Sequence, residues 1–188
     1  MKKTMISLAL TLFAVTGAQA QVATLAPANT PARAHVAARA LDDATIAAIF
    51  DAANTWDIET SRVAVKKSKN KDVLAFADMM IKDHTAVRKL GRDLVAKLKV
   101  TPTPPGADFP LAVDHAKTMK TLNSTTGAAF DKAYIDHEVW YHQAVIDAMT
   151  QQLMPATQNA ELKDLETKVA PNFAAHLAAG KAVQAKLK

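Results

Sequence analysis

The sequence contains no cysteine among its 188 residues. This absence excludes disulfide bonds, thiolate metal sites, haem attached through a Cys-x-x-Cys-His motif and cysteine nucleophiles. Glycine and aromatic residues are also scarce, with 5 glycines and an aromatic content of 5%. Few glycines and long stretches rich in Ala, Leu, Lys and Asp favour helix over sheet. The sequence also has no glycine-rich phosphate loop and no serine in a strand-to-helix elbow, so a nucleophilic triad has no support. Whether the protein is an enzyme stays open, and a non-enzymatic role is favoured.

The N-terminus has the three parts of a secretory signal peptide. Two lysines follow the first Met, residues 5–15 form an apolar run, and Ala18-Gln19-Ala20 is a small-x-small cleavage site. The apolar run is too short for a permanent membrane span, and no later stretch reaches about 18 apolar residues. We therefore predict a signal peptide over residues 1–20, no transmembrane span after cleavage, and a periplasmic or secreted protein.

The charge of the chain does not indicate a nucleic-acid partner. The formal net charge is +5, and two of the positive charges belong to the predicted signal peptide. The remaining basic residues do not gather on one predicted face, and aromatic side chains that could stack on bases are few. We expect no nucleic-acid binding, whereas a protein partner or an oligomer is left open.

Beyond residue 40, apolar residues recur at helical spacing, which predicts a series of helices. Residues 21–40 contain prolines and many alanines and are interpreted as a flexible tail. Pro171 lies inside the last predicted helix and predicts a kink or a restart there. The predicted helices run from Asp42 or Asp43 to about Asn70, from about Asp72 to before Thr101, from about Leu111 to Leu122, from about Thr126 to Met154, where Pro155 ends the helix, and from about Asn159 to near the C-terminus.

The lengths of the connections predict how these helices are joined. The first and second long helices are separated by a few residues, as are the third and fourth, so each pair is expected to form an antiparallel hairpin. The connector between the hairpins, with its short helix, is long enough to run the full length of a bundle. Two hairpins joined by one long crossover is the ferritin-like wiring. We therefore predict that residues 41–188 form an all-α, ferritin-like antiparallel four-helix bundle, with a simple up-down-up-down bundle as the alternative.

Each long helix carries a polar residue on or beside its apolar stripe. Counted at 1.5 Å per residue from one common end, these residues fall within about two helical turns of one level. Neutral imidazoles and a carboxylate that converge inside a bundle are typical of a metal site. We predict a site for a divalent metal, Zn or Fe, with Asp83 and Glu138 as further ligands or hydrogen-bond acceptors, and with the ligands Glu59, His84, His142 and His176.

A second interpretation uses the same residues without a metal. A residue in the middle of a helix lies near mid-height in any bundle of this length, so the histidines could instead form a structural hydrogen-bond network. The protein would then be a non-enzymatic envelope interaction or stress-protection protein. A third interpretation, haem held by His176 and a methionine of the first helix, is disfavoured because the predicted first helix contains no methionine.

Four stretches of the sequence resemble a known family. They are Glu59-Thr-Ser-Arg-Val-Ala, Phe76-Ala-Asp-Met-Met-Ile-Lys-Asp-His84, Gly127-Ala-Ala-Phe-Asp-Lys-Ala-Tyr134 followed by His142, and Pro171-Asn-Phe-Ala-Ala-His176. The chain from about residue 41 to its end is similar to exported bacterial ferritin-like proteins grouped as the domain of unknown function four-one-four-two.

This resemblance implies a ferritin-like fold but no established reaction. It places Glu59, His84, His142 and His176 on polar positions that recur in the family. The sequence departs from true ferritins, which pair carboxylates with Glu-x-x-His motifs. No such motif occurs here, so a single Zn²⁺ or another divalent ion fits the donor set better than a di-iron site.

Overall fold

The computed structural model describes residues 41–106 and 108–187, and every regular element in this part of the chain is a helix. The predicted all-α class is therefore confirmed for the described residues, whereas the predicted signal peptide and tail lie outside them. The elements are, in chain order, α1 (Asp43–Lys67), α2 (Lys71–Leu98), α3 (Pro110–Ser124), α4 (Gly127–Ala148), the π-helical turn η1 (Met149–Leu153), α5 (Met154–Ala156) and α6 (Ala160–Gln184).

Short polar side chains fix where three of the long helices begin. Asp42 Oδ1 accepts a hydrogen bond of 2.7 Å from the backbone N–H of Thr45 in α1. Asn70 and Asn159 each accept bonds from two backbone N–H groups in the first turns of α2 and α6. These N-caps satisfy donors that have no partner within the helix. The predicted starts of the three helices agree with the structure to within one residue.

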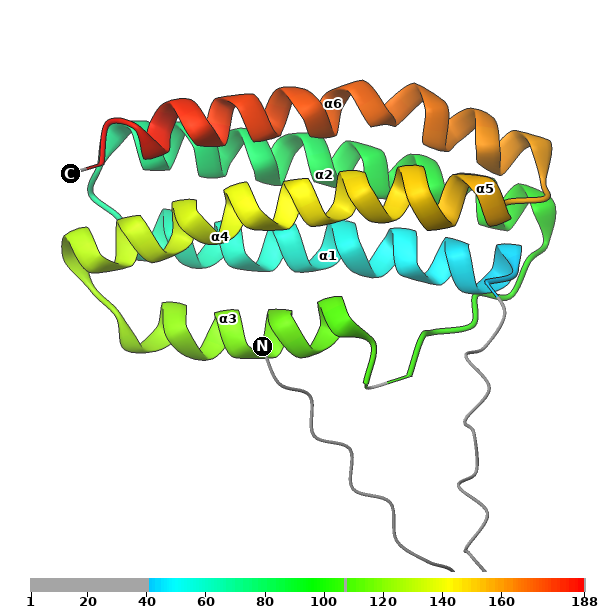
Figure 1. Ribbon diagram of the computed structural model, residues 1–188, viewed down its shortest axis with the longest axis horizontal. Coiled ribbons are helices and arrows are strands. Elements are labelled where there is room, and N and C mark those ends of the chain that lie inside the picture. Colours follow the sequence, from blue (N-terminus) through cyan, green and yellow to red (C-terminus); the bar gives the residue numbers. More distant parts are fainter. Residues whose placement is uncertain (1–40, 107, 188) are drawn as a thin grey trace, which may run out of the picture. The chain divides into compact units, whose positions relative to one another are not determined.

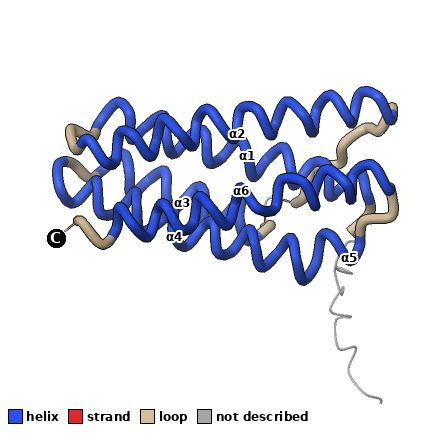
Figure 2. The backbone as a smooth tube through the Cα atoms, turned by 90° about the horizontal axis from the view of Figure 1, so that it is seen from above, coloured by secondary structure: helices blue, strands red, loops and turns tan. Residues whose placement is uncertain are grey.

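The four long helices pack side by side as a bundle (Figures 1 and 2). α1 packs on α2, α4 packs on α6, and the two pairs meet through α2 against α6 and α1 against α4. Each long helix runs antiparallel to both of its packing neighbours (Figure 1). α3 packs along α1 and α4, and the connector that contains it carries the chain from the end of α2 back to the opposite end of the bundle, where α4 begins.

Two prolines lie inside helical segments and do not end them. The third long helix was expected to reach Met154, but its α-helical part ends at Ala148 and the π-helical turn η1 precedes Pro155. Proline has no N–H for the carbonyl four residues earlier, so the regular ladder cannot continue unchanged into this position. For Pro171 the prediction was a kink or a restart. The restart does not occur, because α6 continues through Pro171 while Val169 and Phe173 on either side are buried in the core.

Two apolar clusters fill the interior, one on each side of a polar layer. Each long helix packs against both clusters, and each also carries a buried Asp, Glu or His near its middle. The first cluster contains Ile46, Ile49, Phe50, Val87, Leu111, Tyr141, Val145, Met149, Leu153, Leu162, Leu165, Val169 and Phe173. The second contains Ala64, Val73, Phe76, Ala77, Met80, Leu122, Phe130, Tyr134 and Ile135, with Ala179 and Val183 of α6 packed against it. The polar layer between them contains Asp57, His84, Glu138, His142 and His176, together with the buried Asn54, Thr60 and Ser61 of α1.

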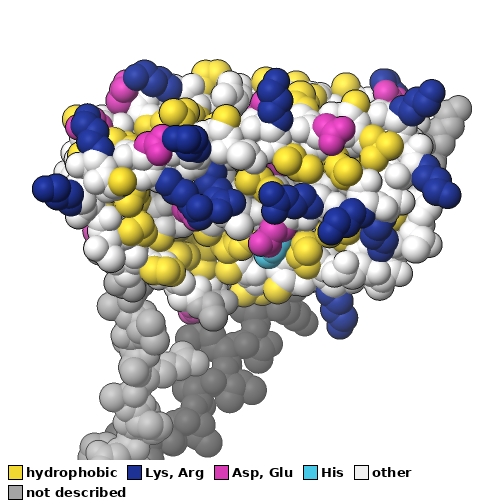
Figure 3. All heavy atoms as spheres, turned by 180° about the vertical axis from the view of Figure 1, so that it is seen from behind, with side chains coloured by type: hydrophobic (Ala, Val, Ile, Leu, Met, Phe, Trp, Pro, Cys, Tyr) yellow, Lys and Arg dark blue, Asp and Glu magenta, His cyan; other side chains and the backbone are white. Residues whose placement is uncertain are grey.

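The surface of the bundle mixes charges of both signs. Figure 3 shows Lys, Arg, Asp and Glu side chains spread over one face, with apolar side chains between them. None of the described helices combines the length and the hydropathy that a membrane span requires.

Candidate metal centre

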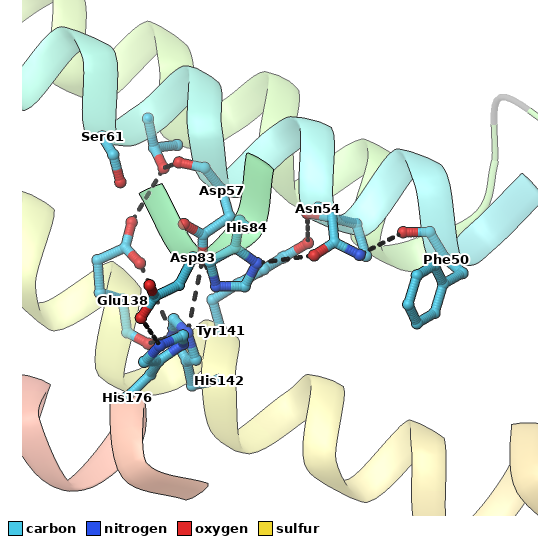
Figure 4. A network of polar contacts seen from close by, with 12 residues as sticks. Phe50, Asn54, Asp57, Ser61, Asp83, His84, Glu138, Tyr141, His142 and His176 are labelled. Carbon is cyan, nitrogen blue, oxygen red and sulfur yellow. Dashed lines mark hydrogen bonds and ion pairs between the residues drawn. The ribbon is translucent and has the colours of Figure 1, made fainter. Parts of the chain in front are cut away.

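Five polar side chains from all four long helices meet in the polar layer (Figure 4). α1 supplies Asp57, α2 supplies His84, α4 supplies Glu138 and His142, and α6 supplies His176. None of the five exposes more than 5% of its surface. Each of these five residues lies one or two helical turns from apolar residues of the same helix that are buried in the core. Burial of those apolar residues therefore brings the five polar side chains close together.

The three imidazole rings and the carboxylate of Asp57 are within contact distance. The ring centres of His84, His142 and His176 are between 5.1 and 5.6 Å apart. Asp57 Oδ2 lies 3.3 Å from Nε2 of His84 and 3.6 Å from Nε2 of His142. Glu138 Oε2 lies 3.7 Å from Nδ1 of His142. The predicted ligands on α2, α4 and α6 are therefore brought together by the fold.

Asn54 fixes the tautomer of His84. The Asn54 Nδ2 group donates to the backbone carbonyl of Phe50 at 2.7 Å, which leaves Oδ1 facing Nδ1 of His84 at 2.9 Å. Because Oδ1 is an acceptor, Nδ1 carries the proton and donates to it. Nε2 of His84 therefore keeps its lone pair, on the side where Asp57 lies.

The other two imidazoles are held in the same way. Nδ1 of His142 donates to the backbone carbonyl of Glu138 at 2.9 Å, and Nε2 of His176 donates to Oδ2 of Asp83 at 3.1 Å. The lone pairs are left on Nε2 of His142 and Nδ1 of His176. One nitrogen held by an acceptor and the other left bare is the arrangement found in metal-ligating histidines.

The remaining polar atoms of the cluster are buried without a hydrogen-bond partner among the described residues. They are Nε2 of His84, Nε2 of His142, Nδ1 of His176, both carboxylate oxygens of Asp57, and Oε2 of Glu138. A buried polar atom without a partner costs about 1–3 kcal/mol, and more when it is charged. Three of these atoms are bare imidazole nitrogens from three helices, and a cation that accepts several lone pairs at once satisfies all three.

Burial sets the protonation state of the cluster. It raises the pKa of Asp57 to about 8, and burial together with the neighbouring Asp57 raises the pKa of Glu138 well above its ordinary value. Burial lowers the pKa of His142 to about 4, and burial with the nearby His142 and His176 lowers the pKa of His84 well below 6.5. At pH 7 His84 and His142 are therefore neutral, whereas Asp57, with a pKa of about 8, retains a proton that a cation must displace.

The donor atoms form two adjoining groups that share His142. One group consists of His84, His142 and His176, and the other of Asp57, Glu138 and His142. Within each group the ligand atoms lie within 4.8 Å of one another. Neutral imidazoles with carboxylate oxygens and no sulfur suit Zn²⁺ or Fe²⁺.

Glu59, predicted as a ligand, does not belong to this cluster. Its side chain is 46% exposed, and its Oε2 lies 2.9 Å from Nε2 of His115 on α3. The prediction of an inward Glu59 is wrong, because the seven-residue spacing of the core positions Phe50 and Ala64 falls on Asp57 instead. Asp57 is the candidate ligand that the sequence analysis missed, and this spacing was the signal that could have found it.

The two other carboxylates singled out in the sequence take different positions. Asp83 accepts the hydrogen bond from His176 and so holds that ring in place. The carboxyl group of Glu138 is fully buried in the cluster, where its Oε1 accepts a hydrogen bond of 2.9 Å from Thr60. His137 lies outside the cluster, with its Nδ1 3.1 Å from the hydroxyl of Thr118 on α3.

The chain matches the model of one protein family, described as a domain of unknown function (DUF4142), over residues 18–183. Comparisons with curated proteins and with solved structures gave no match. The family description names no activity. The function has to be argued from the residues of the polar layer.

Proposed function

Because this chain belongs to the DUF4142 family, whose description assigns no activity, we propose a function from its own geometry: the bundle binds a divalent metal ion, Zn²⁺ or Fe²⁺. The ligands are His84, His142, His176 and the carboxylate of Asp57, with Glu138 beside them. One observation carries the proposal. Three buried imidazoles from three helices each have one nitrogen held by the protein and the other left bare, next to a buried carboxylate.

The bundle is proposed to have ferritin-like wiring. Support comes from the path of the chain, since α2 and α4 run in the same direction and are joined by a connector that returns along the bundle (Figure 1). The ligand set differs from the Glu-x-x-His pairs of di-iron bundles. Three histidines and one carboxylate suit a single ion, with Glu138 available as an additional ligand or as an acceptor.

The protein is further proposed to be exported and to act as a binding protein. The signal-like N-terminus supports a periplasmic or secreted location. The low exposure of all five cluster residues supports binding of a small ion rather than turnover of an organic substrate, which needs direct access to the reacting groups. A resident or carried metal ion fits such an enclosed site.

Metal titration followed by thermal unfolding tests the proposal. A metal-free sample is titrated with Zn²⁺, and with Fe²⁺ under anaerobic conditions, while the melting temperature is recorded. Metal at a thousandfold excess over the dissociation constant stabilises the native state by about 4 kcal/mol. For a domain of this size, each kcal/mol raises the melting temperature by about 2–4 °C. His142→Gln removes one bare nitrogen and is expected to abolish most of the shift.

His137→Gln is the matched control. His137 lies on the same helix, its side chain is 9% exposed, and burial lowers its pKa to about 4, as it does for His142. It lies outside the cluster, so this variant should retain the metal-induced shift. No shift with either metal, or an equal loss in both variants, would favour the structural interpretation of the histidines.

A further inference from the structure

The metal centre approaches the surface at the seam between α2 and α6. His84, His142, Asp57 and Glu138 each expose 2% of their surface or less, whereas His176 exposes 5%. His176 also lines a groove of about 710 Å³ between α2 and α6, together with its partner Asp83. The side chain of Asp83 is 37% exposed. A chain of contacts therefore leads from the groove, through Asp83 and His176, to the cluster.

The carboxylates that line this groove differ in their partners. Glu161 pairs with Lys97, and Asp164 pairs with Lys168 at 2.6 Å, so each of these negative charges is offset by a lysine. For Asp83 the partner seen among the described residues is an imidazole, with Oδ2 3.1 Å from Nε2 of His176. Asp83 thus presents a carboxylate in the groove that no lysine or arginine of the described chain neutralises.

We propose that the groove between α2 and α6 is the path by which the divalent cation enters and leaves, and that Asp83 is the first group of the protein to bind it. The inference rests on the proposed metal site and adds its route of exchange. The two nitrogens of His176 support it, because Nε2 faces Asp83 on the groove side and the buried, unpartnered Nδ1 belongs to the cluster. One ring therefore connects the groove carboxylate with the internal ligands.

A residue on an exchange route alters rates, whereas a ligand alters affinity. Asp83→Asn keeps an oxygen that accepts the hydrogen bond from His176 but removes the negative charge. Electrostatic attraction of a cation speeds association by at least about tenfold in favourable cases, so uptake of Zn²⁺ is expected to slow about tenfold. Because Asp83 also orients His176, the affinity of this variant falls as well, and the uptake rate is the quantity that tests the route. The salt dependence of the uptake rate should also weaken in this variant.

Asp164→Asn is the control for charge. It removes a carboxylate from the same groove, but one that Lys168 already offsets. Its uptake rate should stay within about twofold of the unmodified protein.

A second pair of variants tests the groove itself. Ala175 and Ala174 are both exposed on α6, but Ala175 lines the groove, whereas Ala174 is not among its lining residues. Ala175→Trp is expected to slow uptake and release by narrowing the groove, while Ala174→Trp leaves both rates unchanged. Because both positions are exposed, neither substitution has to fit into the packed core.

Stopped-flow mixing of the metal-free full chain with Zn²⁺, and of the loaded protein with a coloured chelator, measures both rates. Slower uptake in both Asp83→Asn and Ala175→Trp, with the affinity of Ala175→Trp retained and normal rates in the two controls, supports the route. Unchanged rates in both variants overturn it while leaving the metal site intact. Failure of the unmodified protein to bind Zn²⁺, Fe²⁺ or Co²⁺ at all would instead overturn the proposed function.

Discussion

Asp57 is the residue whose position is hardest to explain without a cation. Its carboxyl group is fully buried between imidazole nitrogens and a second carboxyl group, and burial raises its pKa to about 8. Ionisation of such a group destabilises the fold unless a positive charge is near. In the cluster the adjacent groups are the neutral imidazoles of His84 and His142 and a second carboxyl group, so the folded chain itself supplies no such charge.

Asp57→Asn is therefore expected to have opposite effects on stability and on metal binding. At pH 8 the metal-free variant should be more stable by about 1–3 kcal/mol, because it avoids a buried charge. Its affinity for Zn²⁺ should fall by at least tenfold, the loss typical even of residues that only support a ligand. Thermal unfolding with and without Zn²⁺ measures both effects.

Asp131→Asn provides the comparison for this prediction. Asp131 is also buried on α4 with an unpartnered oxygen, but it lies outside the cluster. The Asp131→Asn variant should therefore retain the stabilisation by Zn²⁺. A loss of stability in metal-free Asp57→Asn at pH 8 would show that Asp57 has a structural role.

The helix α6 contains both a helix-breaking proline, Pro171, and the proposed ligand His176. Pro171 lies in the helix interior, exposed, five residues before His176. Proline is about 3 kcal/mol less favourable than alanine there, because it lacks the N–H and its ring crowds the carbonyl of Thr167. The helix persists because tertiary packing of Val169 and Phe173 on either side outweighs the local preference.

Pro171→Ala is expected to stabilise the protein by about 1–3 kcal/mol, since it restores the missing hydrogen bond without changing a core contact. The midpoint of urea unfolding should rise accordingly. Asn172→Ala, at the next exposed position, should change stability by less than about 0.7 kcal/mol. An unchanged or lower midpoint in Pro171→Ala would mean that the helix is shaped around the proline.

The helix α3 is attached to the bundle through polar and aromatic contacts as well as apolar ones. The ring of His115 stacks on Trp56 of α1 at 5.6 Å, and Lys67 donates a hydrogen bond to the backbone carbonyl of Leu122. Leu122 is fully buried in the second apolar cluster. These contacts account for the exposed Glu59, because its carboxylate is engaged by His115 on this outer side of α1.

For the whole molecule, the cluster makes stability depend on pH in two opposing ways. The pKa of Asp57 rises from 3.8 to about 8, and that of Glu138 is also raised, so the folded state holds protons that the unfolded chain has lost. Their contribution to stability therefore falls as pH rises toward 8. The pKa values of His84, His137 and His142 are lowered from 6.5, so their contribution falls as pH drops from about 6.5 toward 4.

The metal-free protein is therefore expected to be most stable near pH 6.5, with a melting temperature that falls toward pH 8 and again below about pH 5. With Zn²⁺ bound, ionised carboxylates face a cation and the decline between pH 6.5 and 8 should disappear. Melting curves across this range, with and without Zn²⁺, measure the difference. A melting temperature of the metal-free protein that rises steadily from pH 6.5 to 8 would contradict the raised pKa values.

The helical class, the approximate ends of the long helices and three of the four proposed ligands could be predicted from the sequence alone. Helix ends follow from local chemistry, as at Asp42, whose side chain caps its own first turn. His84, His142 and His176 could be identified because a polar residue that interrupts an apolar stripe has to enter the core with its neighbours.

The tertiary structure decided which carboxylate joins the three histidines. Glu59 and Asp57 are two residues apart, so they project on different sides of α1, and packing against three other helices selects the side that faces inward. The groove beside Asp83 and His176 is also formed by two helices that are distant in sequence. Contacts between distant segments depend on the relative rotation and depth of packed helices, which the spacing of residues along one helix does not fix.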